Sequence, residues 1–307
     1  MLKQITTHTY YIPGSNNLGV IATGDGGAIA IDTGIDKDTG RVLRKALDGA
    51  GLHLRAIINT HHHADHVGGN AFLLRNLLGV AVYAAPLEAA IIENPILEPS
   101  YLFHGARPIA ALRNRWVMAP GSPVHQLLGP LEAIQRGEEL RATVADTELT
   151  VIGLPGHSPA QIGICCEGVC FAADGFFGPA VLAKHGMPYA YDINAQLASL
   201  ERLILREEIF FLPGHGELTA RAELGATLAA NQAAIENSAA QVLAALAKPG
   251  TIDAITGRVL RAIERSPAGI PQYAIFVGAV AAYLSQLEGQ GRARAELGPE
   301  GVVWSRV

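Results

Sequence analysis

The chain has 307 residues, 49% hydrophobic and 17% charged, which is enough to bury a large core in one domain or in one domain with an appendage. Its net charge of −5 provides no overall positive field for nucleic acid or anionic lipid. The N-terminus lacks a signal-type apolar segment and no run of about 18 uninterrupted apolar residues follows, so we expect no membrane-spanning helix. Three closely spaced cysteines, Cys165, Cys166 and Cys170, are a poor basis for a disulfide framework, and a cytoplasmic setting fits best.

The first third of the sequence predicts strands that lead into alternating helices and strands. Short β-type runs lie at residues 10–12, 18–23 and 28–32, with a glycine-rich hairpin turn between the last two. Asp38 is a candidate N-cap for a helix whose apolar residues follow at helical spacing. An apolar strand at 56–58, a helix at 68–78 and a buried strand at 81–84 come next. This alternation favours a layered α/β domain.

The middle of the chain contains a different kind of segment. Residues 95–137 are rich in proline and glycine and show weak periodicity. A loop-rich stretch of this length is usually functional or disordered, and its apolar content favours an ordered cover over a site. Strand signals return at 148–152, 161–166, 169–173 and 209–212.

The C-terminal part is helical and rich in alanine. Helices are expected at 224–247, 252–264 and 272–288, and a terminal β-hairpin at 292–296 and 302–306. The sequence therefore predicts a main domain over residues 1–218, with its cover at 95–137, and a helical domain over 219–307.

The strongest chemical signal is the run Thr60-His61-His62-His63-Ala64-Asp65-His66, directly after an apolar strand. Alternate residues of extended backbone project to one side, so His61 and His63 can meet, and a turn can direct Asp65 and His66 to a second point. Imidazole and carboxylate suit zinc, and three protein ligands per ion leave a position for water. The alternative is an exposed histidine-rich turn without function.

Three downstream fragments weaken that alternative. Each places one ligand-type residue beside glycine at a strand end, where a sharp turn can direct the side chain to a common point: Pro155-Gly156-His157-Ser158, Ala173-Asp174-Gly175 and Pro213-Gly214-His215-Gly216. Ligands gathered from several strand ends at one rim of a sheet are typical of a site in an α/β fold.

The order H-x-H-x-D-H, then His, Asp and His, resembles the metallo-β-lactamase superfamily over about residues 8–217, and within it the glyoxalase II-like hydrolases. The resemblance implies an α/β fold of four αββα layers with a metal pair at one edge. The run GDGGAIAIDTG at residues 24–34 is similar to the early hairpin of the family, where Asp32 would support the site without binding metal.

The resemblance also implies a ligand set. His61, His63 and His157 would hold a first Zn²⁺, Asp65, His66 and His215 a second, and Asp174 would bridge both. His63 stands where flavodiiron proteins carry Glu, which favours hydrolysis over redox chemistry. Asp174 stands where many antibiotic-degrading members carry Cys, which disfavours a true β-lactamase. Iron or manganese remain alternatives to zinc.

A metal pair about 3.5–4 Å apart predicts hydrolysis by a bridging hydroxide that attacks a carbonyl or phosphoryl centre. Asp65 is expected to orient this hydroxide, and His62, the spacer of the motif, to point away from the metals. Tyr189 and Tyr191 are candidates to donate a hydrogen bond to the substrate oxygen, with ordinary packing as the alternative.

The C-terminal helices and hairpin resemble the winged-helix appendage of some superfamily members. Residues 224–307 carry balanced charge, so nucleic acid is not the expected partner, and a helical domain that narrows the site or forms a homodimer is favoured. The leading interpretation is hydrolysis of a small thioester, then of a lactone or other ester. The alternatives are an endoribonuclease or phosphodiesterase, a β-lactamase-like amide hydrolase, and a regulatory protein with a vestigial metal site.

Overall fold

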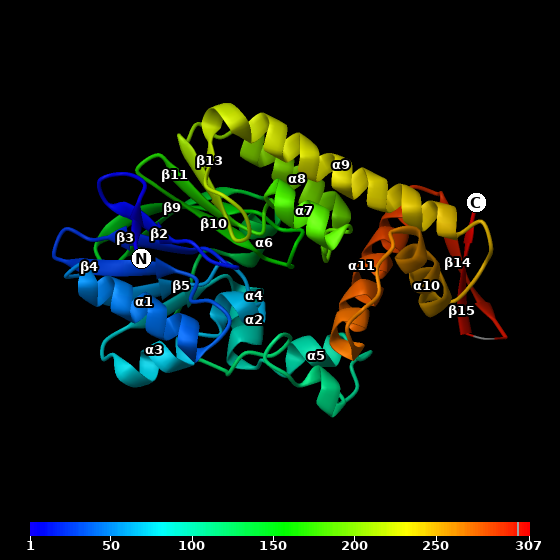
Figure 1. Ribbon diagram of the computed structural model, residues 1–307, viewed down its shortest axis with the longest axis horizontal. Helices are drawn as coiled ribbons and strands as arrows, with labels where there is room; N and C mark the ends of the chain where they lie inside the picture. The colour runs from blue at the N-terminus through cyan, green and yellow to red at the C-terminus, as the bar shows by residue number, and fades with distance from the viewer. Residues whose placement is uncertain (300) are drawn as a thin grey trace.

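The computed structural model describes residues 1–299 and 301–307, and its two large β-sheets lie side by side in the left part of Figure 1. The first sheet has seven strands, in spatial order β1 (Lys3–Gln4), β2 (Thr9–Ile12), β3 (Leu18–Ala22), β4 (Gly27–Ile31), β5 (His53–Ile58), β6 (Ala81–Ala84) and β7 (Gln126–Leu127). The second has six, in spatial order β13 (Thr219–Ala220), β12 (Phe210–Pro213), β11 (Val169–Ala173), β10 (Ile162–Cys166), β9 (Thr147–Gly153) and β8 (Glu139–Val144).

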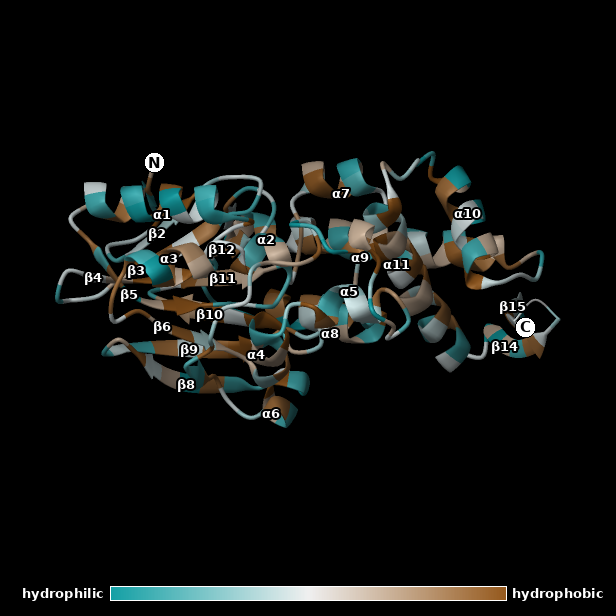
Figure 2. Cartoon of the chain, turned by 90° about the horizontal axis from the view of Figure 1, so that it is seen from below, coloured by the Kyte–Doolittle hydropathy of each residue, from teal (hydrophilic) through white to brown (hydrophobic). Residues whose placement is uncertain are grey.

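Alternate residues of each strand separate the layers. In β4, Ile29 and Ile31 face a buried cluster shared with Val151, Ile164 and other residues of the second sheet. Ala28 and Ala30 face the opposite cluster, which the helices α1 (Lys37–Gly49) and α3 (Asn70–Asn76) complete. The polar outer face of α1 is visible in Figure 2. Successive strand side chains point to opposite faces, so one sheet serves two cores.

Helices also cover the outer face of the second sheet. They are α8 (Ile193–Ile204) and α9 (Arg221–Ala245), while α7 (Pro179–His185) lies against α9 and α6 (Leu131–Gln135) packs into the cluster between the sheets through Ile134. Leu200 of α8 and Leu224 of α9 pack with Phe211 of β12 in one buried cluster. The order is therefore helix, sheet, sheet, helix, and the predicted αββα sandwich is confirmed.

The C-terminal part contains three helices and a hairpin. Beyond the start of α9, the chain forms α10 (Ile252–Ala262), α11 (Ile270–Gly289), β14 (Ala293–Gly298) and β15 (Gly301–Arg306), so the expected helices and hairpin are present. Figure 1 shows α9 extending from the second sheet to these elements. The predicted boundary at residue 218 and the winged-helix likeness stay predictions.

Helix α11 has the length and apolar composition of a membrane span, and it is the one such helix in the described part of the chain. The sequence pattern predicted none. A single helix of this kind is weak grounds for a membrane protein, because core helices pass the same test. Its C-terminal half packs into the core through Tyr283, Leu284 and Leu287.

One local prediction is wrong, and the limits of another change. The cap of α1 is Asp36, whose Oδ1 accepts hydrogen bonds from the backbone N–H groups of Asp38 and Thr39, because the helix begins at Lys37 and Asp38 already lies in its first turn. The helix expected at 68–78 is present as α3, two residues shorter at each end, and a short helix that the sequence pattern did not predict, α2 (Ala64–Val67), precedes it. Gly68 and Gly69 separate the two helices, and an added Cβ there would lie 2.0 and 2.4 Å from backbone oxygens.

The covering segment, residues 95–137, is ordered. It contains α5 (Leu97–Tyr101), a 3₁₀ turn at Ala110–Leu112, β7 and α6, and it follows α4 (Pro86–Glu93), which the sequence pattern did not predict. Leu102, just after α5, lies 3.8 Å from the Cβ position of Gly278 in α11. Figure 1 shows α5 beside the lower end of α11, so the covering segment joins the sandwich to the C-terminal helices.

Candidate metal centre

The loop after β5 supplies four of the seven predicted ligands. His61 and His63 lie in the extended segment that follows the strand, and Asp65 and His66 lie in the first turn of α2. The backbone direction changes at His63, which caps this short helix. The motif can therefore present ligands to two neighbouring points.

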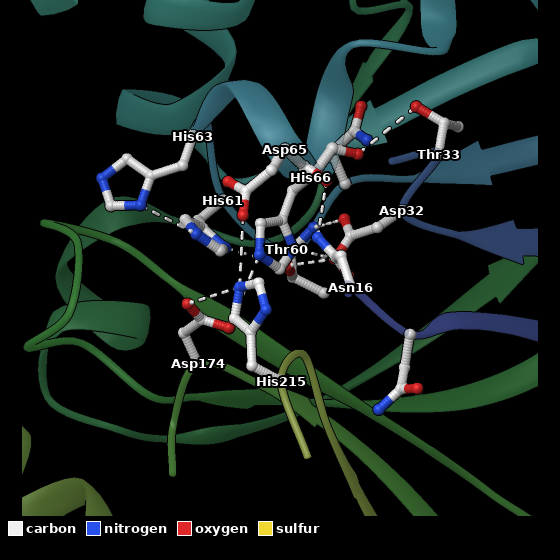
Figure 3. Close-up of polar contacts among 12 residues, drawn as sticks. Asn16, Asp32, Thr33, Thr60, His61, His63, Asp65, His66, Asp174 and His215 are labelled. Atoms are coloured by element: carbon white, nitrogen blue, oxygen red, sulfur yellow. Dashed lines mark hydrogen bonds and ion pairs between the residues drawn. The ribbon is translucent and has the colours of Figure 1, made fainter. Parts of the chain in front are cut away.

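The other three ligands come from the second sheet. His157 follows β9, Asp174 follows β11 and His215 follows β12. Strands β11 and β12 are parallel neighbours, so their carboxyl ends lie at the same edge. This edge faces the loop after β5, and Figure 3 shows Asp174 and His215 pointing toward the residues of the histidine motif.

Three histidines form what we call the first group: His61, His63 and His157. Their ligand atoms all lie within 4.8 Å of one another. His63 Nδ1 is 3.1 Å from His61 Nε2 and 2.9 Å from His157 Nε2. Burial and the neighbouring imidazoles hold the pKa of His61 and His63 well below the usual range, so both rings are neutral, as metal ligation requires.

Asp65, His66 and His215 form the second group, whose ligand atoms also lie within 4.8 Å of one another. His215 Nε2 is 3.2 Å from Asp65 Oδ2. Asp174 lies between the groups: one of its oxygens is 3.2 Å from His157 Nε2 and 3.6 Å from His215 Nε2, and the other is 3.5 Å from His66 Nε2. The structure therefore brings all seven predicted ligands together, with Asp174 in a bridging position.

These residues fit a pair of cations. His66 Nε2 and Asp174 Oδ1 are buried without a hydrogen-bond partner in the described residues, and both face the other ligands. Buried polar atoms of this kind are costly unless a partner is bound. The donor set of five imidazoles and two carboxylates is one that zinc prefers.

The outer ring nitrogens have the partners expected of metal-binding histidines. His66 Nδ1 lies 2.7 Å from Asp32 Oδ2, His157 Nδ1 lies 3.1 Å from the carbonyl oxygen of Tyr189, and His215 Nδ1 lies 2.5 Å from that of Ser15. Donation from Nδ1 leaves the Nε2 lone pair free to face the metal position. Asp32 thus contacts a predicted ligand, His66, and is not itself among the seven predicted ligands.

The two predicted tyrosines differ in their surroundings. The ring of Tyr189 packs against His63 and His157, with centroids 5.7 and 5.6 Å away, and burial raises the pKa of its hydroxyl. The side chain of Tyr191 is 62% exposed, although its backbone N–H donates to the Gly156 carbonyl. Tyr189 is therefore the better placed of the two, and catalysis by either stays a prediction.

Sequence reasoning missed two buried carboxyl groups near the motif. The Nδ1 of His62 contacts Glu88 of α4. Glu98 of α5 has a carboxylate oxygen within 4.8 Å of ligand atoms of His62 and His63. Glu88 interrupts an apolar run at residues 86–92, and a lone acid in such a run was the available signal.

Comparison with known families matches residues 11–215 to the Metallo-beta-lactamase superfamily. The chain belongs to this superfamily. All seven residues of the site lie inside the matched region. The predicted membership is therefore confirmed.

Solved structures of the metallo-β-lactamase superfamily share the fold along the whole chain. A metallo-beta-lactamase family protein from Thermus thermophilus is similar with a TM-score of 0.72 at 23% identity, covering 98% of this chain and 99% of that one. A beta-lactamase domain protein from Burkholderia ambifaria has a TM-score of 0.73 at 20% identity, covering 100% and 93%. At these identities the likeness concerns the fold alone.

Curated relatives in the superfamily are named hydroxyacylglutathione hydrolase. The protein of this name from Xanthomonas axonopodis pv. citri is 26% identical over 195 residues, which is 60% of this chain and 56% of that protein. The chain spans from about a fifth to just over half of the length of the first such relatives.

Proposed function

We propose that the chain is a metal-dependent hydrolase with two zinc ions, acting on a small thioester and, next in order, on a lactone or another ester. The observation that carries this proposal is the position of Asp174, whose two oxygens contact ligands of both groups. The names of the curated relatives support a thioester as the first substrate class.

In this proposal, His61, His63 and His157 would hold one ion and Asp65, His66 and His215 the other, and Asp174 would be available to both. Bound zinc supplies Lewis acidity and lowers the pKa of coordinated water. Asp32 keeps the lone pair of His66 Nε2 directed inward through its contact with Nδ1. No side-chain nucleophile is required.

Exposure indicates the side from which substrate approaches. His61, His66 and His157 are at least 95% buried, whereas the side chains of Asp65 and His215 are 36% and 20% exposed. We infer that substrate enters beside Asp65 and His215. At this entrance the Asp65 carboxylate can orient water, while Tyr189 packs against the first group and can donate a hydrogen bond to a substrate oxygen.

The test combines metal analysis with a panel of substrates. The purified protein is expected to contain two equivalents of zinc and to hydrolyse a 2-hydroxyacyl thioester of glutathione faster than a lactone, a β-lactam or an RNA phosphodiester. Treatment with a chelator should abolish hydrolysis, and added Zn²⁺ should restore it. Asp174→Ala is the matched negative control.

The panel also decides among the alternatives. Cleavage of RNA with no activity on any carbonyl substrate would overturn the proposal in favour of a phosphodiesterase. Preference for the β-lactam would favour an amide hydrolase. Metal binding without any hydrolysis would favour a regulatory protein.

A further inference from the structure

Glu88 in α4 is a fully buried carboxylate that contacts two ligand-bearing loops at once. Its Oε2 accepts hydrogen bonds from the backbone N–H of His62, at 3.0 Å, and from His62 Nδ1. Its Oε1 accepts from Ser158 Oγ and from the backbone N–H of Ala160, both at 2.7 Å. Oε2 therefore binds the loop that contains His62, and Oε1 binds the loop that contains Ser158 and Ala160.

The two loops carry the whole first group. His62 lies between His61 and His63, and Ser158 directly follows His157. The Glu88 carboxylate thus links the backbone of the loop that carries His61 and His63 to the backbone of the loop that carries His157. We propose that Glu88 is a positioning residue that sets the distance between these loops, so that the first group is formed before metal binds. This inference rests on the proposed metal-dependent function.

Helix α4 gives Glu88 a fixed position. Ala89 and Ile92 of the same helix pack in a buried cluster with Ala64 and Val67 of α2. The carboxylate is therefore held by a rigid element rather than by a loop, which makes the position of its hydrogen-bond partners well defined.

The second group has separate supports. Asp32 contacts His66 Nδ1, and Asn16 Nδ2 donates to the carbonyl oxygen of Asp65 at 2.5 Å. Asn17 Nδ2 donates to the carbonyl oxygens of Pro213 and Gly216, on both sides of His215. None of the contacts described for Glu88 reaches these supports. Loss of Glu88 should therefore affect the first group and spare the second.

The four donors require a carboxylate. Glutamine has the same shape but offers one acceptor oxygen, and its NH₂ group would face two N–H or O–H donors. Glu88→Gln therefore breaks the link to one loop and leaves buried donors unpaired. Loss of such an outer hydrogen-bond partner typically lowers metal affinity about 10–100-fold.

The experiment measures Zn²⁺ affinity by competition with a chromophoric chelator in two single-group backgrounds. His215→Ala leaves the first group complete, and His157→Ala leaves the second group complete. We expect Glu88→Gln to weaken Zn²⁺ binding about 10–100-fold in the His215→Ala background and less than about twofold in the His157→Ala background. Glu201→Gln, at an exposed position of α8, is the matched control and should change neither value.

The split between backgrounds distinguishes positioning from general loss of structure. Equal weakening in both backgrounds, or none in either, would overturn the proposal. If Glu88→Gln does not fold, Ser158→Ala removes one of the four hydrogen bonds with the charge intact, and it should weaken only the first group. Failure of the wild-type protein to hydrolyse any thioester or ester would end the proposed function, while the Zn²⁺ affinities would still decide the role of Glu88.

Discussion

Asp32 Oδ2 lies 2.7 Å from Nδ1 of the buried His66 ring. The same carboxylate accepts hydrogen bonds from the backbone N–H of Thr60, at 2.9 Å, and from its hydroxyl, at 2.7 Å. The backbone of Asp32 has φ of 62°, a left-handed conformation that costs energy in a residue with a side chain. Its three hydrogen bonds offset this cost and connect the hairpin before α1 to the start of the histidine motif.

We expect Asp32→Asn to weaken Zn²⁺ binding to the second group about 10–100-fold. The amide cannot accept from all three donors, so the orientation of His66 is no longer fixed. Zn²⁺ titration with a competing chelator measures the change. Asp48→Asn, at an exposed position of α1, is the matched control. Unchanged Zn²⁺ affinity in Asp32→Asn would contradict the role of this carboxylate.

Gly214→Ala is expected to weaken Zn²⁺ binding to both groups by about tenfold or more, because Asp174 contacts both. A Cβ at this position would lie 2.2 Å from Asp174 Oδ1 and 2.8 Å from His66 Cε1, so these ligands must move. Gly49→Ala is the control, since a Cβ there meets nothing within 4 Å. Wild-type Zn²⁺ affinity in a folded Gly214→Ala protein would show that the ligands tolerate the displacement.

Tyr189→Phe is expected to lower kcat about 100-fold or more without changing zinc content, because the ring that carries the hydroxyl packs against His63 and His157 of the first group. Tyr191→Phe should lose less, since its side chain is largely exposed. Steady-state kinetics and elemental analysis of both variants measure the difference. Full turnover in both variants would assign these tyrosines to packing alone.

Glu98 predicts a pH dependence in the metal-free protein. Burial raises the pKa of its carboxyl to about 8, above the ordinary 4.5, so the folded chain keeps a proton that the unfolded chain has lost between these values. The buried, neutral Glu98 carboxyl therefore costs the folded chain no stability at low pH. The free energy of unfolding falls as pH rises toward 8, because the unfolded chain releases a proton that the folded chain keeps. Glu98→Gln should stabilise the chain relative to wild type by an amount that grows with pH, approaching about 1.4 kcal/mol per pH unit.

Urea unfolding in chelator at pH 5, 6, 7 and 8 measures the Glu98 effect. Glu201→Gln serves again as the exposed control, and its difference from wild type should not vary with pH. A stability difference between Glu98→Gln and wild type that is constant over this range would contradict the burial argument.

The sequence alone determined the local features of this protein. Apolar runs bounded by glycine or proline predict β4, β6 and β11, because the alternation of apolar runs and turn residues is visible in the local sequence. The histidine motif and the three glycine-flanked ligands indicate a metal centre for the same reason, since the chemistry of each donor is visible in its own residue type. Gly68 and Gly69, which separate α2 from α3, are visible in the sequence. The backbone oxygens that they approach are not, because these belong to residues more than 30 positions earlier.

Only the tertiary structure decided which distant groups share the site. Glu88 meets Ser158 across 70 residues, and Glu98 comes close to His63 because the covering segment folds back over the motif. The residues next to Glu88 in the sequence do not show which groups its carboxylate contacts. Its role follows from the donors around it, and their positions depend on the packing of sheets and helices that no local pattern encodes.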